Sequence, residues 1–173
     1  SQNKTLKTAY ENGMQLHFIS RTDYREKASK EFIQQLKNMF GNFYLVSEGG
    51  TNELAIKGCE EILTEYDAEF DFVCSAIGTG GTISGLINTL ASHQKVIGFP
   101  ALKGSFLQKE IEQYVGDKNN WTLNLNYHFE GYAKYNTDLI SFINWFYKAT
   151  KIPLDPIYTG KMLFGILDLI KKN

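Results

Sequence analysis

A strand pattern that runs directly into a glycine-rich turn is the feature that most constrains the fold of this chain. Residues 70–77 are almost continuously apolar, and the loop Gly78–Gly81 follows at once, before apolar residues at helical spacing from Ile83 to Leu90. An uninterrupted apolar run is typical of a strand that helices cover on both faces, as in a parallel sheet. We therefore predict a strand, a tight turn and a helix here.

The rest of the chain predicts further strands and helices in alternation. This order implies right-handed crossover connections and a mostly parallel sheet. We therefore expect an α/β fold with three layers, α/β/α. The predicted helices cover residues 3–12, 29–39, 52–66, 83–90, 105–115, 139–147 and 161–172, and the predicted strands cover residues 14–20, 43–46, 70–77, 95–99 and 121–127.

Short polar residues and glycines mark where several of these helices begin and end. Asn3 and Asn52 stand where a side-chain oxygen can accept a hydrogen bond from the first helical turn. Gly13 and Gly41 follow helical patterns, and we predict that the helices stop there.

The composition and charge argue against a nucleic-acid-binding or membrane protein. The chain has 173 residues, of which 43% are hydrophobic, and a formal net charge of −1. A nucleic-acid interface requires clustered Lys and Arg, and no such cluster stands out. No apolar run approaches the length of a membrane span, and the N-terminus has no apolar signal-peptide core. We expect neither nucleic acid nor a membrane as a partner.

The cysteines and histidines predict free thiols and no metal site. Cys59 lies on a helical stripe and Cys74 in an apolar strand, so both are expected to be buried free thiols. The histidines, His17, His93 and His128, are scattered singly, whereas a zinc site needs several ligands close together. Free thiols fit a reducing compartment, and we expect a cytoplasmic protein.

The glycine turn has the residues needed to bind a phosphate group. Glycines let the backbone turn sharply and approach an anion closely. Free N–H groups at a helix start, together with the helix dipole, favour negative charge. A plain tight turn is the alternative, but such turns also draw on Asn, Asp, Pro and Ser. The residues predicted to bind phosphate are Gly78, Thr79, Gly80, Gly81 and Thr82.

Two nucleotide-binding motifs resemble this loop, but each lacks a defining residue. A Walker loop has a lysine after its second glycine, and here Leu86 follows Gly85. A dinucleotide fingerprint has Gly or Ala at its sixth position, where this chain has Ile83. The next predicted strand should end in an acidic residue for the ribose, but it ends in Phe99 and Pro100. These departures disfavour a nucleotide site.

Three segments of the chain resemble one family of enzymes. Gly78–Thr82 resembles the phosphate-binding loop of the fold-type II pyridoxal-phosphate enzymes, the tryptophan-synthase-β-like group. Glu48–Asn52 and Leu154–Met162 resemble segments of the branch that holds D-cysteine desulfhydrase and 1-aminocyclopropane-1-carboxylate deaminase. The resemblance runs over essentially the whole chain and implies pyridoxal 5′-phosphate as the cofactor.

The resemblance assigns roles to individual residues. It implies that Gly78–Thr82 holds the cofactor phosphate, that Asn52 contacts the substrate, and that Tyr158 acts near the substrate as acid, base or nucleophile. Tyr132 is implied as a second pocket tyrosine, although Glu130 departs from the glycine usual in that segment. The alternative for either tyrosine is a core aromatic ring whose hydroxyl finds a partner.

The residue after the implied active-site tyrosine bears on the substrate. Thr159 stands where the 1-aminocyclopropane-1-carboxylate deaminases have a glutamate that pairs with the pyridine nitrogen of the cofactor. The desulfhydrases have threonine there, so the resemblance favours D-cysteine as substrate. The implied enzyme is a lyase or hydrolase of amino-acid metabolism, a deaminase or desulfhydrase that releases ammonia and a 2-oxo acid from a small amino acid.

Two segments of the family are not found in this sequence. The family's Schiff-base lysine lies on an earlier segment, whereas Lys4 and Lys7 fall on a helix near the end of the family's smaller domain, and the family's last strand is also missing. We expect residues 1–40 to be the end of the smaller domain with the return connection, and residues 41–173 to be most of the large cofactor-binding domain. The chain alone is predicted to be inactive, and the full-length protein is predicted to be a homodimer.

Two other classes of function stay open from the same residues. A non-catalytic regulatory or interaction domain on the same fold would also lack the lysine, and a cofactor titration would separate it from an enzyme. A nucleotide-binding module is the other alternative, and a nucleotide melting-shift screen would test it.

Overall fold

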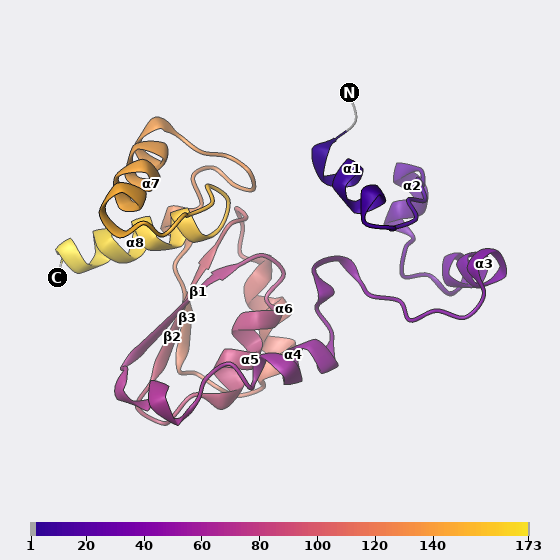
Figure 1. The fold of residues 1–173 in the computed structure, drawn as a ribbon. Coiled ribbons are helices and arrows are strands. Elements are labelled where there is room, and N and C mark those ends of the chain that lie inside the picture. Colours follow the sequence, from indigo (N-terminus) through magenta and orange to yellow (C-terminus); the bar gives the residue numbers. More distant parts are fainter. Residues whose placement is uncertain (1–2, 173) are drawn as a thin grey trace. The chain divides into compact units, whose positions relative to one another are not determined.

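The computed structural model describes residues 3–172, and the chain divides into two compact units (Figure 1). The first unit ends at Leu45 and the second begins at Val46. The first unit contains three helices among its described residues, α1 (Lys4–Glu11), α2 (Arg21–Arg25) and α3 (Lys30–Phe40).

Side-chain caps explain where the helices of the first unit begin. Asn3 Oδ1 accepts a hydrogen bond of 2.8 Å from the Thr5 amide, as predicted. The Ser29 hydroxyl accepts one of 3.1 Å from the Phe32 amide at the start of α3. Each of these bonds satisfies an amide that has no acceptor within its own helix. At the other end of α3, Gly41 follows the last residue with a φ of 76°, a conformation that favours glycine.

The two strands predicted near the N-terminus are wrong. Residues 14–20 and residues 43–46 have no regular secondary structure, and the short helix α2 was not predicted. Most of their apolar residues are exposed, among them Met14, Phe18 and Val46. Alternating apolar residues form a strand only where a partner strand supplies hydrogen bonds, and no strand of the described residues pairs with either segment.

The second unit is built on a parallel sheet of three strands, in the order β1-β2-β3. They are β1 (Phe72–Ile77), β2 (Lys95–Pro100) and β3 (Trp121–Leu123), with Val73 opposite Val96 and Ile97 opposite Thr122. Helices cross between consecutive strands, α5 (Gly81–Thr89) after β1 and α6 (Phe106–Val115) after β2. The predicted parallel α/β arrangement is confirmed.

Helices cover both faces of this sheet, so the fold has three layers. On one face, Ile77 and Val96 pack into the buried core with α5 and α6, together with Ile83, Leu86, Ile87, Leu107, Ile111 and Val115. On the opposite face, Phe99 lies beneath α8 (Thr159–Lys172), where its ring approaches Gly165. Ile77 and Val96 point to one face and Phe99 to the other because side chains alternate along a strand.

Two predicted elements are shorter than the sequence indicated. The predicted strand 121–127 ends at Leu123, because Asn124 Oδ1 accepts a hydrogen bond of 3.1 Å from the Asn126 amide and turns the chain into a 3-10 helix, η3 (Leu125–Tyr127). The predicted helix 52–66 ends at Cys59, as α4 (Glu53–Cys59). A second 3-10 helix, η2 (Glu65–Glu69), begins where Asp67 Oδ2 accepts from the Thr64 amide at 2.8 Å.

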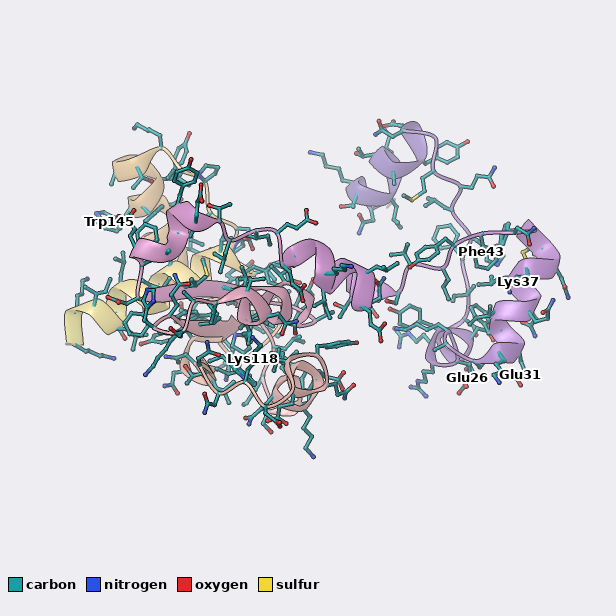
Figure 2. The ribbon with its side chains drawn as sticks, turned by 90° about the horizontal axis from the view of Figure 1, so that it is seen from below. Glu26, Glu31, Lys37, Phe43, Lys118 and Trp145 are labelled. Atoms are coloured by element: carbon teal, nitrogen blue, oxygen red, sulfur yellow. The ribbon has the colours of Figure 1, made fainter. Side chains whose placement is uncertain are left out.

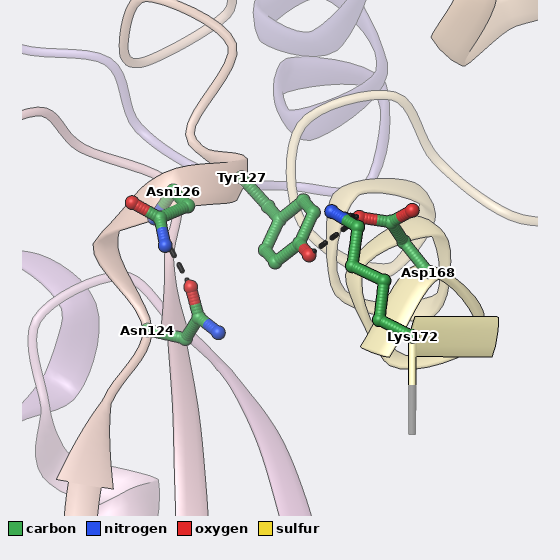
Figure 3. Close-up of polar contacts among 5 residues, drawn as sticks. All are labelled: Asn124, Asn126, Tyr127, Asp168 and Lys172. Atoms are coloured by element: carbon green, nitrogen blue, oxygen red, sulfur yellow. Dashed lines mark hydrogen bonds and ion pairs between the residues drawn. The ribbon is translucent and has the colours of Figure 1, made fainter. Parts of the chain in front are cut away.

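Polar contacts tie η3 to the last helix (Figure 3). The Tyr127 hydroxyl donates a hydrogen bond of 2.7 Å to Asp168 Oδ2, and Lys172 Nζ forms an ion pair with the same oxygen at 2.7 Å. The Tyr127 ring also packs against Phe164 of α8, with 6.4 Å between ring centroids. These contacts hold α8 on the sheet.

Contacts elsewhere in the second unit fix its outer layers. Lys118, which is labelled in Figure 2, lies in the loop before β3. Its Nζ donates a hydrogen bond of 3.1 Å to the Asn88 carbonyl. The remaining helix, α7 (Thr137–Thr150), packs against α8 through Phe142 and Phe164, whereas Trp145 of α7 is exposed.

Within residues 3–172, no helix is both long enough and apolar enough to cross a membrane.

Candidate functional site

The loop between β1 and α5 begins the candidate site. The strand ends at Ile77, whose carbonyl accepts a hydrogen bond of 3.0 Å from the Ala101 amide after β2. The chain then turns through Gly78–Gly80, and Gly80 caps α5 in a left-handed conformation with a φ of 94°. Only glycine adopts this conformation without strain, so Gly80 sets the direction in which α5 leaves the sheet.

The amide groups of this loop are open to a ligand. Within residues 3–172, the amides of Thr79, Gly80, Gly81 and Thr82 donate to no protein carbonyl. These four residues line a cavity of about 350 Å³ at the start of α5. Free amides at a helix N-terminus attract an anion through their hydrogen atoms and through the helix dipole. The loop therefore has the chemistry that the sequence predicted for a phosphate site.

The turn before α4 forms the opposite wall of the cavity. Thr51 Oγ1 and Thr79 Oγ1 lie 2.6 Å apart, at hydrogen-bond distance. Glycines permit this approach, because a Cβ on Gly49 would lie 2.6 Å from Thr79 Cγ2 and a Cβ on Gly81 would lie 2.9 Å from Thr51 Oγ1. The remaining lining residues near this wall include Gly50, Ala55 and Cys59.

Tyr158 closes the cavity from the start of α8. It lines the cavity together with the glycine loop, and a Cβ on Gly78 would lie 3.5 Å from its hydroxyl oxygen. The side chain therefore reaches the loop from a segment far along the chain. The residue that the resemblance implies as the active-site tyrosine therefore lines the same cavity as the predicted phosphate-binding loop.

Asp155 fixes the turn that carries Tyr158. Asp155 Oδ1 accepts hydrogen bonds from the amides of Ile157 (2.8 Å) and Tyr158 (2.7 Å). Asp155 Oδ2 accepts from the Thr159 amide at 2.9 Å and from the Thr159 hydroxyl at 2.6 Å. One carboxylate thus satisfies three amides at the start of α8, in the manner of a helix cap.

Burial and neighbouring groups shift the pKa values of these two residues. Burial pushes the pKa of the Asp155 carboxyl up, but the hydrogen bonds from Thr159, Tyr158 and Ile157 outweigh it and hold the pKa below its ordinary value. Burial, followed by the nearby Tyr132 hydroxyl and the Asp155 charge, raises the pKa of Tyr158. At neutral pH, Tyr158 is therefore a protonated hydroxyl, able to donate a hydrogen bond into the cavity.

Tyr132 lies beside Tyr158 but at the edge of the site. Their rings meet edge to face, with centroids 6.1 Å apart and an interplanar angle of 64°. The Tyr132 side chain is 52% exposed and does not line the cavity itself. The structure therefore brings the two predicted tyrosines together, with Tyr158 inside and Tyr132 outside.

Two other predicted site residues use their polar atoms in the fold. Asn52 Oδ1 accepts a hydrogen bond of 2.9 Å from the Ala55 amide and caps α4, as its position predicted. The Thr159 hydroxyl donates to Asp155 and accepts from the Asp155 amide at 3.1 Å. Neither residue lines the cavity. Their implied contacts with substrate and cofactor stay predictions.

Several residues of the site were not singled out from the sequence. Ala55 and Cys59 line the cavity from α4, four residues apart on one face of the helix. Their spacing is the available signal, but the same spacing also predicts an ordinary core face. Asp155 could have been found as an acidic residue just before a helix, where its charge favours the positive end of the helix dipole.

The cavity fits a phosphate-bearing ligand better than a metal ion. Its lining offers amides, threonine hydroxyls and one tyrosine hydroxyl, and none of the described lining residues is a carboxylate, a histidine or a lysine. Across residues 3–172, no three His, Cys, Asp or Glu side chains gather as metal ligands. Backbone amides that donate to no other protein group are suited to binding an anion.

Comparisons with known proteins relate most of this chain to one group of proteins. A Pyrococcus horikoshii protein that carries the provisional name 1-aminocyclopropane-1-carboxylate deaminase is 28% identical over 165 residues, which cover 85% of this chain and 50% of that protein. A bifunctional D-cysteine desulfhydrase/1-aminocyclopropane-1-carboxylate deaminase of Arabidopsis thaliana, named as mitochondrial, is 27% identical and covers 93% of this chain and 46% of its own length. The chain is a homologue of these proteins. The resemblance that the three sequence segments indicated is confirmed.

One solved structure has a fold similar to that of this chain. That structure is described as an ACC deaminase homologue. The match has a TM-score of 0.72 and 22% identity, and it covers 96% of this chain and 57% of the solved chain. No protein-family model matches the chain. The chain spans about half the length of the curated relatives it matches. The relatives' names support a deaminase or desulfhydrase and give no support for a hydrolase.

Proposed function

We propose that the full-length protein is a pyridoxal-phosphate-dependent deaminase or desulfhydrase that releases ammonia and a 2-oxo acid from a small amino acid. The observation that carries this proposal is the cavity shared by the free amides of residues 79–82 and the Tyr158 hydroxyl. The names of the relatives support the same reaction class. We favour D-cysteine over the cyclopropane amino acid because Thr159 follows the tyrosine.

In this proposal the glycine loop binds the phosphate of the cofactor. The amides of Thr79, Gly80, Gly81 and Thr82 donate to its oxygens, and the α5 dipole adds a favourable field. The bond between Thr51 and Thr79 fixes one wall. When bound, the cofactor supplies an electron sink for charge that develops on the substrate carbon.

Tyr158 supplies the proton chemistry of the site. Because its pKa is raised, the hydroxyl holds its proton at Oη at neutral pH and donates a hydrogen bond toward the reacting atoms. Asp155 accepts a hydrogen bond from the Tyr158 amide and so fixes the backbone that carries the ring. Gly78 has no side chain, which leaves room for the Tyr158 ring beside the loop. In the same proposal, Tyr132 borders the pocket, Asn52 orients the substrate from the α4 side, and Thr159 is near the cofactor ring.

The proposal also covers the organisation and setting of the full-length protein. Residues 1–40 belong to the end of a smaller domain and residues 41–173 to most of the cofactor-binding domain. The division between Leu45 and Val46 supports a boundary in this region. We propose a cytoplasmic homodimer. Cys59 and Cys74 are free thiols, half-buried rather than buried as predicted, and free thiols are consistent with a reducing compartment.

Two experiments test the proposal separately for binding and for activity. For binding, the melting temperature of the chain is measured with pyridoxine 5′-phosphate, which cannot form an imine, and with pyridoxine as the control without phosphate. We expect a shift with the phosphate form alone. For activity, the full-length gene product is assayed for ammonia and 2-oxo acid from D-cysteine. The chain itself is expected to be inactive and to show no saturable imine absorbance with pyridoxal phosphate.

The alternatives predict different results in the same experiments. A regulatory domain would show the pyridoxine 5′-phosphate shift, but its full-length protein would release no ammonia from any small amino acid. A nucleotide-binding module would be stabilised by a nucleotide and not by pyridoxine 5′-phosphate. Equal shifts with and without the phosphate group would contradict the phosphate site itself.

A further inference from the structure

Lys161, in the first turn of α8, is buried although it carries a charge. Its side chain is 2% exposed, among the most deeply buried large side chains of the described residues. Burial lowers the pKa of this lysine, and the nearby Asp155 charge acts in the opposite direction. Removing an ammonium group from water is unfavourable unless its hydrogen bonds are satisfied. The contacts of Lys161 therefore indicate its role.

Both partners of the Lys161 ammonium are carbonyls of one distant turn. Nζ donates hydrogen bonds to the His128 carbonyl at 2.9 Å and to the Gly131 carbonyl at 2.8 Å. The described residues provide no ion-pair partner for it. Lys161 does not line the cavity, so it is not placed to react with a ligand there.

The turn that Lys161 holds has an unfavourable backbone conformation. The Gly131 amide donates to the His128 carbonyl at 3.0 Å, which closes a four-residue turn. Its two central residues, Phe129 (φ 52°) and Glu130 (φ 69°), are both in the left-handed region. Bulky residues rarely adopt this conformation, and it persists where surrounding contacts impose it. The two bonds from Lys161 clamp both ends of the turn.

This turn leads directly into Tyr132. The Tyr132 ring meets Tyr158 edge to face, at 6.1 Å between centroids. Tyr158 lies three residues before Lys161, at the start of α8. The start of α8 therefore carries one tyrosine and clamps the turn before the other.

We propose that Lys161 is a positioning residue that holds Tyr132 against Tyr158 by clamping the turn from His128 to Gly131. The proposal rests on the proposed function only in that Tyr158 is the acting group of the site. An apolar side chain of the same length would fill the space at a lower desolvation cost. The hydrogen bonds to the two carbonyls, rather than packing, are what the lysine contributes.

The test follows the ionisation of Tyr158 in the absence of cofactor. The full-length protein is labelled with [13Cζ]tyrosine, the Tyr158 resonance is assigned with Tyr158→Phe, and its pH dependence is recorded. Tyr132 contributes to the raised pKa of Tyr158, so Tyr132→Phe should let Tyr158 titrate at a lower pH. We expect Lys161→Met to produce the same downward shift. Lys134→Met, which removes an exposed lysine three residues after the turn, should leave the titration unchanged.

A double variant separates positioning from general loss of stability. If Lys161 acts through Tyr132, the double variant Lys161→Met/Tyr132→Phe should titrate like Tyr132→Phe alone, because the second change has nothing left to remove. A double variant shifted by the sum of the two single shifts would overturn the proposal. A Lys161→Met variant in which Tyr158 titrates as in the wild type would do the same.

A measurement on the wild-type protein covers the case in which Lys161→Met does not fold. With 15N-labelled lysine and 13C-labelled carbonyls, the Lys161 ammonium should show slow proton exchange and through-bond couplings to the His128 and Gly131 carbonyls. Fast exchange without couplings would contradict the clamp. Because neither measurement needs the cofactor, inactivity of the full-length protein on amino acids would count against the proposed function and leave this inference standing.

Discussion

The hydroxyl oxygens of Thr51 and Thr79 lie 2.6 Å apart, which joins the turn before α4 to the loop after β1. One of the two hydroxyls donates its proton to the other, so the bond fixes the direction of both. The two segments share no strand pairing, and this bond is a direct polar link between the two walls of the cavity.

Removing this link should weaken binding of a phosphate-bearing ligand. Thr51→Val keeps the β-branched shape and removes the hydroxyl, which costs about 1 kcal/mol for an ordinary hydrogen bond. We expect about fivefold weaker binding of pyridoxine 5′-phosphate, measured by calorimetric titration. Thr8→Val, on the exposed surface of α1, is the control and should bind as the wild type does. Unchanged affinity in Thr51→Val would show that the link does not shape the site.

Tyr158→Phe should separate turnover from binding in the full-length enzyme. The phenyl ring keeps the packing beside Gly78 and removes the proton at Oη. We expect kcat to fall by about 100-fold or more, as for loss of a positioned acid or base, while ligand affinity stays within about twofold. Tyr147→Phe, half-exposed on α7, is the matched control. A proportional loss of both quantities would indicate that Tyr158 only supports the cavity wall.

Asp155 should make stability depend on pH in the acidic range. Its pKa is lower in the folded chain, so its contribution is complete above the unfolded value of about 3.9 and is lost as the pH falls through the folded value. Asp155→Asn should lower the free energy of unfolding by about 2 kcal/mol at about pH 7, because an amide donor then faces backbone donors. In denaturant titrations, the difference in free energy of unfolding between the variant and the wild type should shrink at low pH. Asp117→Asn, at an exposed site, should show no such gap.

Thr159 should influence the choice of substrate. We expect the full-length enzyme to act on D-cysteine better than on 1-aminocyclopropane-1-carboxylate. Thr159→Glu should move the ratio of kcat/KM values toward the cyclopropane substrate, while it weakens the turn by placing a second carboxylate beside Asp155. Thr159→Ser keeps the hydroxyl bond and should keep the ratio. A wild-type preference for the cyclopropane substrate would refute this assignment.

Two helical glycines should respond in opposite directions to the same substitution. A Cβ on Gly85 of α5 would lie 2.5 Å from Cys59 Cβ and 2.7 Å from the Ile56 carbonyl oxygen, so Gly85→Ala forces α4 away from α5. We expect a loss of about 3 kcal/mol in the free energy of unfolding. Gly58 of α4 has nothing within 4 Å of the same position. Gly58→Ala should therefore stabilise the chain by up to about 1 kcal/mol.

Local patterns were enough to predict most of the second unit. The apolar run before Gly78, the glycine turn and the helical spacing after it predicted β1, the loop and α5, which the structure confirms. Asn3 and Asn52 cap the helices they were expected to cap. These features depend on neighbours a few residues away, so a single sequence contains them.

Features that depend on distant partners could not be predicted in the same way. Residues 14–20 alternate like a strand, but a strand needs a second chain segment beside it, and no local pattern says whether one is present. The pairing of Thr51 with Thr79, and the clamp from Lys161 to the turn before Tyr132, join residues that only the folded sheet brings together. Tyr158 was placed at the site from a resemblance to a family and not from its spacing.

The cavity draws its walls from segments that are far apart along the chain. Thr51 and Thr79 are 28 positions apart. Tyr158 and Gly78, which approach each other in the cavity, are separated in the sequence by α5, α6 and α7. We expect contacts of this range to form late in folding, because the entropy of closing long loops must be lost before they contribute. A ligand of this cavity therefore has almost nothing to bind in a half-folded chain. It stabilises the native state chiefly by slowing unfolding, and it gives the refolding chain little acceleration.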